Sequence, residues 1–251
     1  MKRCTHLFYQ TYSMASYSNV CLIPIDGNIG SGKSTLLEHL KKRFANHPSI
    51  IFATEPVSSW EKIKDHKGVT MLEKFYSNQS QYAFPFQMMA FISRLAVLRE
   101  LVRKADGEPI VIVSERSLYT DKHIFAKMLC DQGNIEDVNY QIYLQWFHEF
   151  ADDFPIEHCI YIQADPLICS QRIHKRARTG EDTIPLSYLR TCHEYHENYV
   201  KMYPNKLVLD GNEDIYEHPE ILDDWIRRVE EKILPKSKES WCSKLFRFIG
   251  F

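Results

Sequence analysis

A glycine-rich segment between an apolar run and a helical pattern constrains this chain more than any other feature. Residues 20–25 are almost wholly apolar and are followed by Gly27-Asn28-Ile29-Gly30-Ser31-Gly32-Lys33-Ser34-Thr35. This segment matches G-x-x-x-x-G-K-[ST], in which glycines let backbone N–H groups surround an oxyanion and the next helix adds its positive end. The pattern predicts a strand, a phosphate-binding loop (P-loop) and a helix. Lys33 is expected to reach the outer phosphates, and the Ser34 hydroxyl to ligate Mg²⁺.

Short apolar runs alternate with longer helical patterns along the rest of the chain. The runs show little alternation of polar and apolar residues, which is typical of strands buried on both faces of a parallel sheet. They span residues 20–25, 50–53, 110–113, 159–162 and 207–209, and the helical patterns span 34–44, 86–102, 140–150, 185–202 and 219–233. The sequence therefore predicts an α/β fold of P-loop kinase type: a doubly wound, five-stranded parallel sheet flanked by helices.

Composition excludes several classes of protein. The 251 residues include 44% hydrophobic side chains, and 31 Lys and Arg balance 33 Asp and Glu, which gives a net charge of −2. A chain with so little excess charge has no basic field for binding nucleic acid, and no window reaches the ~18 apolar residues of a membrane helix. One domain is predicted over residues 20–234, between a flexible extension (1–19) and a basic amphipathic tail (235–251). Packing of the tail against its own domain or a dimer mate is favoured over contact with an anionic membrane.

Cysteine usage and the first residues bear on localisation. The seven cysteines are scattered and form no C-x-x-C pair, which favours a reducing compartment. The first 25 residues lack Asp and Glu and contain several Ser, Thr and Tyr, a composition faintly like that of an organelle transit peptide. A cytoplasmic location is predicted, with mitochondria as the alternative.

Charged residues follow two further strands of the expected sheet. Glu55 follows the second run, and Glu115 and Arg116 follow the third. In sheets of this type ligands bind beyond the carboxyl ends of the strands, so these groups are expected to meet near the phosphate loop. Phosphoryl transfer needs a base for the acceptor hydroxyl, a carboxylate near the metal and a cation on the moving phosphoryl group, and we assign Glu55, Glu115 and Arg116 to these roles. The alternative is that the two carboxylates cap neighbouring helices.

The nearly all-apolar helix over residues 86–102 is interrupted by two polar side chains. Gln87 and Arg94 are two turns apart on one face, with the small Ala90 between them. An amide and a guanidinium so arranged would read the edge of a planar base, and Asp121 is the expected ion-pair partner of Arg94. Alternatively, both face solvent or a neighbouring carboxylate. The aromatic residues nearby are more often core than pocket wall: Trp60, Phe84, Phe86 and Phe125.

A cationic cluster follows the fourth strand. Residues 172–178 contain five basic side chains, and a glycine-containing turn comes next. Such a run is usually a solvated face. Beside a phosphate loop, it favours a lid whose arginines close over the phosphates and exclude water.

Together these motifs resemble those of the deoxynucleoside kinase family, in its deoxycytidine and deoxyguanosine kinase-like branch. The resemblance extends from Ile23 to about Asp214. It rests on the phosphate loop, Thr54-Glu55-Pro56-Val57 with Trp60, Phe86-Gln87, Ser93-Arg94, Glu115-Arg116-Ser117, Arg176-Ala177-Arg178 with Ile184-Pro185-Leu186, and Leu209-Asp210-Gly211-Asn212-Glu213-Asp214.

The resemblance implies a homodimer that transfers the γ-phosphate of ATP to the 5′-hydroxyl of a deoxynucleoside with Mg²⁺. It makes Glu55 the base, places Glu115 and Arg116 at the metal and phosphates, and pairs Gln87 with the nucleobase. It also implies that the substrate contacts Trp60, Phe86 and Phe125, and that Tyr76 and Glu181 bind the sugar 3′-hydroxyl. On the donor side, it implies a lid formed by Arg172, Arg176 and Arg178, and contact of the donor adenine with the backbone near Asp214.

The resemblance also bears on base preference. Arg94 with Asp121 is the pair of members that take deoxycytidine, deoxyadenosine or deoxyguanosine, because this pair crowds the methyl group of thymine. Gly180 departs from the family, which commonly has an acidic residue there beside the residue that corresponds to Glu181. Two other functions stay open: a nucleoside monophosphate kinase, which needs a further cationic site, and a non-catalytic nucleotide-binding regulator.

Overall fold

The computed structural model describes residues 19–234 except 157, 179 and 182. Five parallel strands form one sheet in the order β2-β3-β1-β4-β5, which confirms the predicted fold class. The strands are β1 (Val20–Gly27), β2 (Ile50–Ala53), β3 (Ile110–Glu115), β4 (Cys159–Gln163) and β5 (Lys206–Asp210). The predicted extension and tail lie outside the described residues, apart from Asn19.

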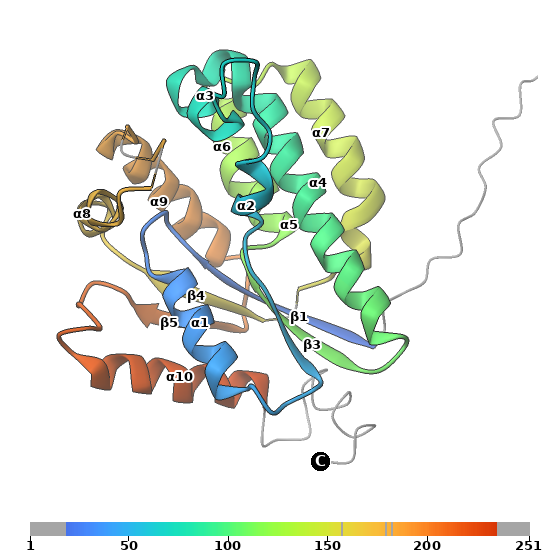
Figure 1. The fold of residues 1–251 in the computed structure, drawn as a ribbon, viewed down its shortest axis with the longest axis vertical. Coiled ribbons are helices and arrows are strands. Elements are labelled where there is room, and N and C mark those ends of the chain that lie inside the picture. Colours follow the sequence, from blue (N-terminus) through green and yellow to red (C-terminus); the bar gives the residue numbers. More distant parts are fainter. Residues whose placement is uncertain (1–18, 157, 179, 182, 235–251) are drawn as a thin grey trace, which may run out of the picture.

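Helices cover both faces of this sheet, with α1 and α10 on one side and α4 and α7 on the other (Figure 1). Along β1, Cys21, Ile23 and Ile25 pack on the first pair, while Val20 and Leu22 pack on the second. The α-helices are α1 (Lys33–Arg43), α2 (Val57–Trp60), α3 (Met71–Ser77), α4 (Gln79–Ala105), α5 (Leu118–Thr120), α6 (Lys127–Asp131), α7 (Asp137–Phe150), α8 (Pro166–Arg176), α9 (Leu186–Val200) and α10 (Pro219–Ile233). A π-helical turn, η1 (Asp121–Ala126), follows α5, and a 3₁₀ turn, η2 (Ala151–Asp153), follows α7.

The helix predicted over 86–102 is longer than expected at its start. It begins at Gln79, where the Asn78 side chain accepts the Gln81 N–H, and it continues through Pro85. A proline inside a helix removes one backbone hydrogen bond. Burial of Ala83 and Phe86, on either side of the proline, offsets that loss.

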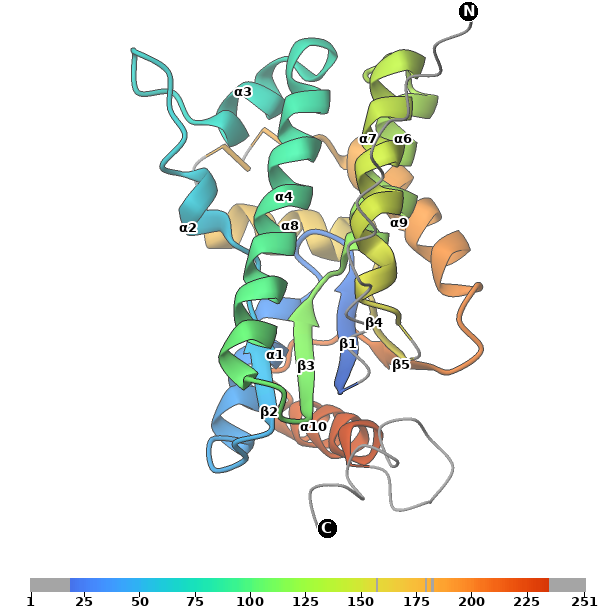
Figure 2. The same cartoon turned by 90° about the vertical axis from the view of Figure 1, so that its right-hand side faces the viewer.

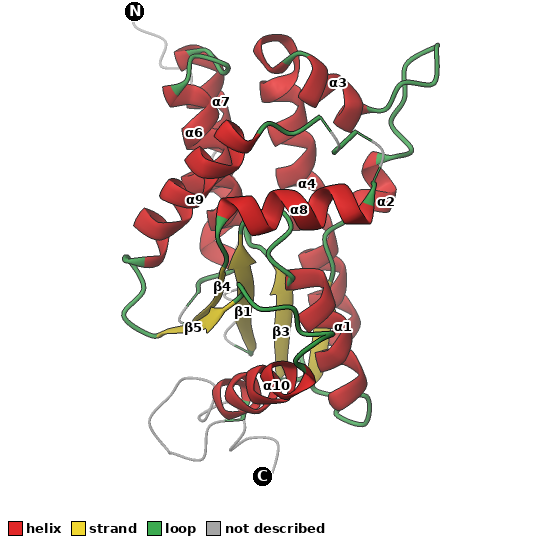
Figure 3. Cartoon of the chain, turned by 90° about the vertical axis from the view of Figure 1, so that its left-hand side faces the viewer, coloured by secondary structure: helices red, strands yellow, loops and turns green. Residues whose placement is uncertain are grey.

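The carboxyl ends of the strands point toward α8, which crosses above them (Figures 2 and 3). The loop after β1 lies directly against this helix, because a Cβ atom on Gly30 would come within 2.6 Å of the Cys169 carbonyl oxygen. No described helix combines the length and the apolar character needed to cross a bilayer.

Candidate active site

A cavity of about 650 Å³ lies at the carboxyl ends of the strands. Its wall combines the phosphate loop, the ends of β2 and β3, one face of α4, and α8 with the turn after it. The predicted residues in this wall are Ile29, Gly30, Ser31, Gly32, Lys33, Ser34, Thr35, Glu55, Trp60, Tyr76, Phe86, Gln87, Arg94, Glu115, Arg116, Asp121, Phe125, Arg172, Arg176, Arg178, Glu181 and Asp214. The structure therefore brings together residues that are far apart in sequence.

Two residues of the phosphate loop lie behind the wall. Gly27 is the last residue of β1, and the Asn28 amide Nδ2 donates to the carbonyl oxygen of Leu189 on α9 (2.8 Å). The Asn28 side chain therefore fixes the loop to α9, and any contact of this residue with a phosphate would come from its backbone.

Positive φ angles shape the rest of the phosphate loop. Gly30 (φ 80°) and Gly32 (φ 103°) adopt a region that favours glycine, and the space where a Cβ of Gly32 would lie is open. The Lys33 ammonium is buried and donates to the Asn28 carbonyl oxygen (2.6 Å). Burial, helped by the positive charge of Arg116, lowers the pKa of Lys33 to about 7. A nearby anion, such as a phosphate group, would therefore stabilise the charged form of Lys33.

Ser34 and Glu115 form the candidate metal position. The Ser34 hydroxyl donates to Glu115 Oε1 (2.7 Å), so two oxygen groups lie together at the start of α1. Among the described residues, no group of three or more His, Cys, Asp or Glu could hold a metal by itself. Two protein oxygens beside a phosphate site fit Mg²⁺, which usually keeps waters and takes further oxygens from phosphates.

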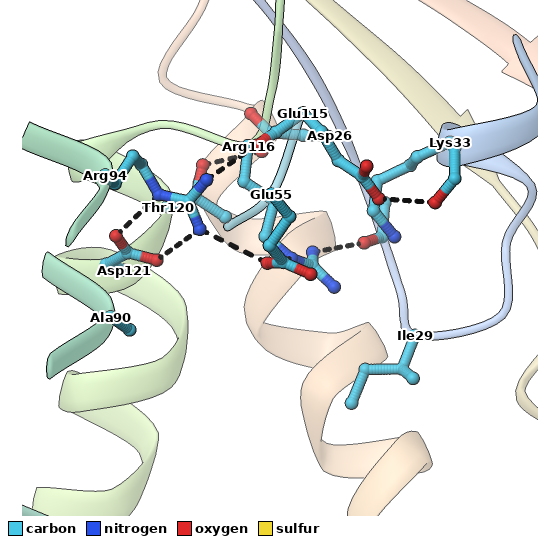
Figure 4. A network of polar contacts seen from close by, with 12 residues as sticks. Asp26, Ile29, Lys33, Glu55, Ala90, Arg94, Glu115, Arg116, Thr120 and Asp121 are labelled. Carbon is cyan, nitrogen blue, oxygen red and sulfur yellow. Dashed lines mark hydrogen bonds and ion pairs between the residues drawn. The ribbon is translucent and has the colours of Figure 1, made fainter. Parts of the chain in front are cut away.

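Glu55 lies between two guanidinium groups (Figure 4). Its Oε1 accepts from Arg94 Nη2 and from Arg116 Nε, each at 3.2 Å. Burial alone would raise the pKa of Glu55, but Arg116, Arg94 and Lys33 outweigh it and lower the pKa to about 2. Oε1 carries both of these bonds, and Oε2 accepts no hydrogen bond from another described residue. An ionised acceptor therefore faces the cavity.

Arg94 and Asp121 form the predicted ion pair. Arg94 Nε donates to Asp121 Oδ2 (2.8 Å), Nη2 donates to Oδ1 (3.3 Å), and Nη1 donates to the Glu115 carbonyl oxygen (2.6 Å). Both side chains are almost completely buried, with exposed fractions of 5% and 3%. Gln87 lies on the same face of α4, as does Ala90, and its amide makes no hydrogen bond to another described residue. The cavity therefore presents an unpaired amide next to a fixed guanidinium–carboxylate pair.

Aromatic rings form one side of the cavity: Trp60, Phe86 and Phe125 line it, as the resemblance implies, whereas Phe84 packs against the core and is not part of the wall. Trp60 packs edge-on against Phe86 and donates from Nε1 to Ser93 Oγ (2.8 Å), while the Phe125 ring lies 4.8 Å from the Arg116 guanidinium carbon. Sequence reasoning missed further wall residues, among them Leu72, Phe75 and Tyr188. The rings of Phe75 and Phe86 are stacked, with their centroids 4.4 Å apart. Phe75 lies on the short helix α3, and a prediction of this helix could have indicated it, but the helix was not predicted.

The cationic cluster divides between α8 and the turn after it. Arg172 lies on α8 and donates to the carbonyl oxygens of Gly211 (2.6 Å) and Glu213 (2.9 Å), so it holds the loop after β5. Arg176, at the end of α8, and Arg178 both pair with Glu181, the latter at 3.0 Å. The predicted lid is therefore partly a helix, and its arginines are tied to the carboxylate that the resemblance places at the sugar.

The loop after β5 closes the far end of the cavity. Asp214, Ile215 and Tyr216 line it together with Trp225 of α10. The Asp214 carboxylate accepts the Tyr216 N–H (2.9 Å), and the Tyr216 side chain is 76% exposed. The cavity thus runs from this loop, past the phosphate loop, to α4.

This geometry defines a class of protein. A P-loop at one end of a cavity, an amide and an ion pair at the other, and an ionised carboxylate between them are the parts of a P-loop kinase that acts on a small acceptor.

Comparisons with known proteins give the family. Residues 23–234 match the model of the deoxynucleoside kinase family. The chain is 36% identical over 181 residues to the probable deoxycytidine kinase of fowlpox virus, covering 71% of each chain. It is 31% identical over 238 residues to human deoxycytidine kinase, covering 83% of this chain and 89% of the other. It is 29% identical over 211 residues to the mitochondrial deoxyguanosine kinase of Xenopus laevis, covering 77% and 78%.

The chain belongs to the deoxynucleoside kinase family. It is a kinase that phosphorylates nucleosides for nucleotide salvage, with a nucleotide as phosphate donor.

Proposed function

We propose that this kinase transfers the γ-phosphate of ATP to the 5′-hydroxyl of deoxycytidine, deoxyadenosine or deoxyguanosine in preference to thymidine. The observation that carries this proposal is the position of Glu55, which faces the cavity between the phosphate loop and the Arg94–Asp121 pair. A nucleoside with its base against Gln87 and Arg94 would direct its 5′ end toward Glu55 and the phosphate loop.

Glu55 accepts the proton of the 5′-hydroxyl. Its Oε2 is the atom available for this, since Oε1 holds two guanidinium groups. The new bond joins the 5′-oxygen to the γ-phosphorus, the bond from that phosphorus to the bridging oxygen breaks, and ADP leaves. With a pKa of about 2, Glu55 is a weak base in the free protein. The proton therefore moves late, as suits a loose transition state in which the nucleophile gains little charge early.

Cations around the phosphates stabilise the negative charge of the transferred group and of the donor. In this proposal Lys33 and Arg116 bind the transferred phosphoryl group, and Arg176 and Arg178 close on the donor. Ser34 and Glu115 would hold Mg²⁺, which when bound neutralises phosphate charge. The open space at Gly32 and the buried ammonium of Lys33 support a triphosphate here.

The Arg94–Asp121 pair supports the choice of base. The three relatives described in the previous subsection are named as deoxycytidine or deoxyguanosine kinases. A bidentate charged pair next to the free amide of Gln87 offers donors and acceptors to a base edge, while its bulk opposes a methyl group at the same place.

A homodimer is part of this proposal. On α7, Val138, Ile142 and Trp146 are spaced by four residues and are 58%, 43% and 47% exposed, and Ile92 of the adjacent α4 is exposed as well. An exposed apolar stripe on two packed helices supports association with a second copy through this face.

A panel of substrates tests the proposal. Purified protein is given labelled ATP and Mg²⁺ with each of the four deoxynucleosides, and separately with dCMP and dTMP. Phosphorylation of deoxycytidine, deoxyadenosine or deoxyguanosine with much weaker use of thymidine is expected. Activity only on the monophosphates would identify a monophosphate kinase, and ATP binding without turnover would identify a regulator.

A further inference from the structure

Asp26 is a buried carboxylate for which the mechanism above has no use. It is the seventh residue of β1, directly before Gly27, and its exposed fraction is 0%. It does not belong to the cavity wall. All its neighbours in residues 20–25 are apolar or cysteine, so an apolar residue would suit the strand better unless the carboxylate has a specific partner.

That partner is the hydroxyl of Thr120. Thr120 Oγ1 donates to Asp26 Oδ1 at 2.6 Å, and Cys159 Sγ on β4 donates to Oδ2 at 3.4 Å. Thr120 gives its single hydroxyl proton to the carboxylate, so in its contact with Ser117 Oγ (2.8 Å) the serine is the donor. Burial raises the pKa of Asp26, and the Thr120 bond and the charges of Arg116 and Lys33 oppose that shift.

Thr120 ends a strained turn. Arg116 has φ 63°, a left-handed conformation that costs free energy for any residue other than glycine. Ser117 and Thr120 form a reciprocal capping box directly after it, and the Ser114 hydroxyl donates to the Arg116 carbonyl oxygen (2.7 Å). A turn with this backbone persists only where its surroundings hold it.

Three consecutive residues of β1 provide that hold. The Ile25 carbonyl oxygen accepts the Arg116 N–H (3.1 Å), the Asp26 carboxylate accepts the Thr120 hydroxyl, and the Gly27 carbonyl oxygen accepts Arg116 Nη1 (2.8 Å). Asp26 is the one whose side chain makes the contact. The same three residues lead directly into the phosphate loop.

The segment held in this way carries three groups of the site. Glu115 contacts Ser34, Arg116 contacts Glu55, and Asp121, the residue after Thr120, pairs with Arg94 (Figure 4). We propose that Asp26 is a positioning residue: by accepting the Thr120 hydroxyl, it fixes the segment from Glu115 to Asp121 against the phosphate loop, so that the donor and acceptor sites keep one relative geometry. This inference rests on the proposed function.

Thr120→Val tests the inference, because it removes the hydroxyl and keeps the shape of the side chain. We expect kcat per active site to fall by about tenfold to a hundredfold, since small misplacements of reacting groups have effects of this size. The preference for deoxycytidine over thymidine should shrink as well, because Asp121 is adjacent. Thr120→Ser restores the hydroxyl and should return both values to within about threefold of the wild type.

Cys159→Ala is the matched control. It removes the other hydrogen bond to Asp26 from an equally buried position, and it should lower the melting temperature without changing kcat or the order of nucleosides. If Thr120→Val does not fold, Thr120→Cys is measured in its place, since a thiol is a weaker donor of similar size, and a smaller loss in the same direction is expected.

Two results are distinguished by this design. A wild-type protein that phosphorylates no deoxynucleoside refutes the proposed function. An active wild type, with Thr120→Val or Thr120→Cys equal to it in kcat and in nucleoside order, overturns the role of Asp26, even if stability falls.

Discussion

Breaking the Arg94–Asp121 pair is expected to change both stability and the choice of nucleoside. Arg94→Met leaves the Asp121 carboxylate buried with none of its observed hydrogen bonds, whereas Asp121→Ala leaves Arg94 bonded to Glu55 and to the Glu115 carbonyl oxygen. Uncompensated buried charges cost about 3–5 kcal/mol, and a lost hydrogen bond costs about 1–3 kcal/mol. Arg94→Met should therefore be the more destabilising of the two.

The double variant separates the pair from its surroundings. With both partners removed, no charge of the pair is left behind, so its loss of stability should be smaller than the sum of the two single losses by about 0.5–3 kcal/mol. Urea unfolding of the four proteins measures this difference. If the loss in the double variant equalled the sum of the two single losses, the contact at 2.8 Å between Arg94 and Asp121 would contribute no coupling free energy to stability.

The nucleoside preference is measured on the same proteins. Loss of the charged bonds to the base edge is worth about 1–3 kcal/mol, so the ratio of kcat/KM for deoxycytidine over thymidine should fall roughly 5- to 150-fold in the double variant. Arg99→Met with Asp153→Ala removes a second pair that involves α4 but lies outside the cavity wall, and should leave the ratio unchanged. An unchanged ratio in the Arg94 and Asp121 variant would refute the proposed reading of the base.

Two further predictions follow from the site and from α7. Because the pKa of Lys33 is about 7 in the free protein and nearby phosphate charge raises it, ATP binding at pH 8 should take up protons, and affinity should fall as pH rises through 7 and above. Calorimetry in buffers of different ionisation enthalpy measures the uptake; no uptake, or uptake that persists in Lys33→Met, contradicts the assignment. Ile142→Asp with Trp146→Asp should convert a dimer to a monomer in sedimentation velocity, and an unchanged sedimentation coefficient would show that this face is not the interface.

The sheet and its order of elements were predictable because buried parallel strands need continuous apolar runs. The ends of the strands were harder to predict. β3 extends through Ser114 and Glu115, and these polar residues did not fit the apolar run from which the strand was predicted. The start of α4 was wrong by seven residues because Pro85 imitates a boundary, while the packing that overrides it is tertiary.

The charged centre of the site was also predictable from the sequence, because Glu115 ends one strand, Arg116 follows it, Glu55 follows another, and both strands end at one edge of the sheet. Other features were not. The π-helical turn from Asp121 and the left-handed Arg116 have no sequence pattern of their own. Asp26 did have one, an acidic residue inside an apolar strand, but its partner Thr120 is 94 positions away.

Glu55→Gln tests the central claim most directly. The amide keeps the size of the side chain and a hydrogen-bond acceptor but does not take a proton, so kcat should fall by about 10²- to 10⁴-fold while the KM for the nucleoside stays within about threefold. Turnover within a few-fold of the wild type would contradict the account, since the 5′-hydroxyl proton would then go to another group.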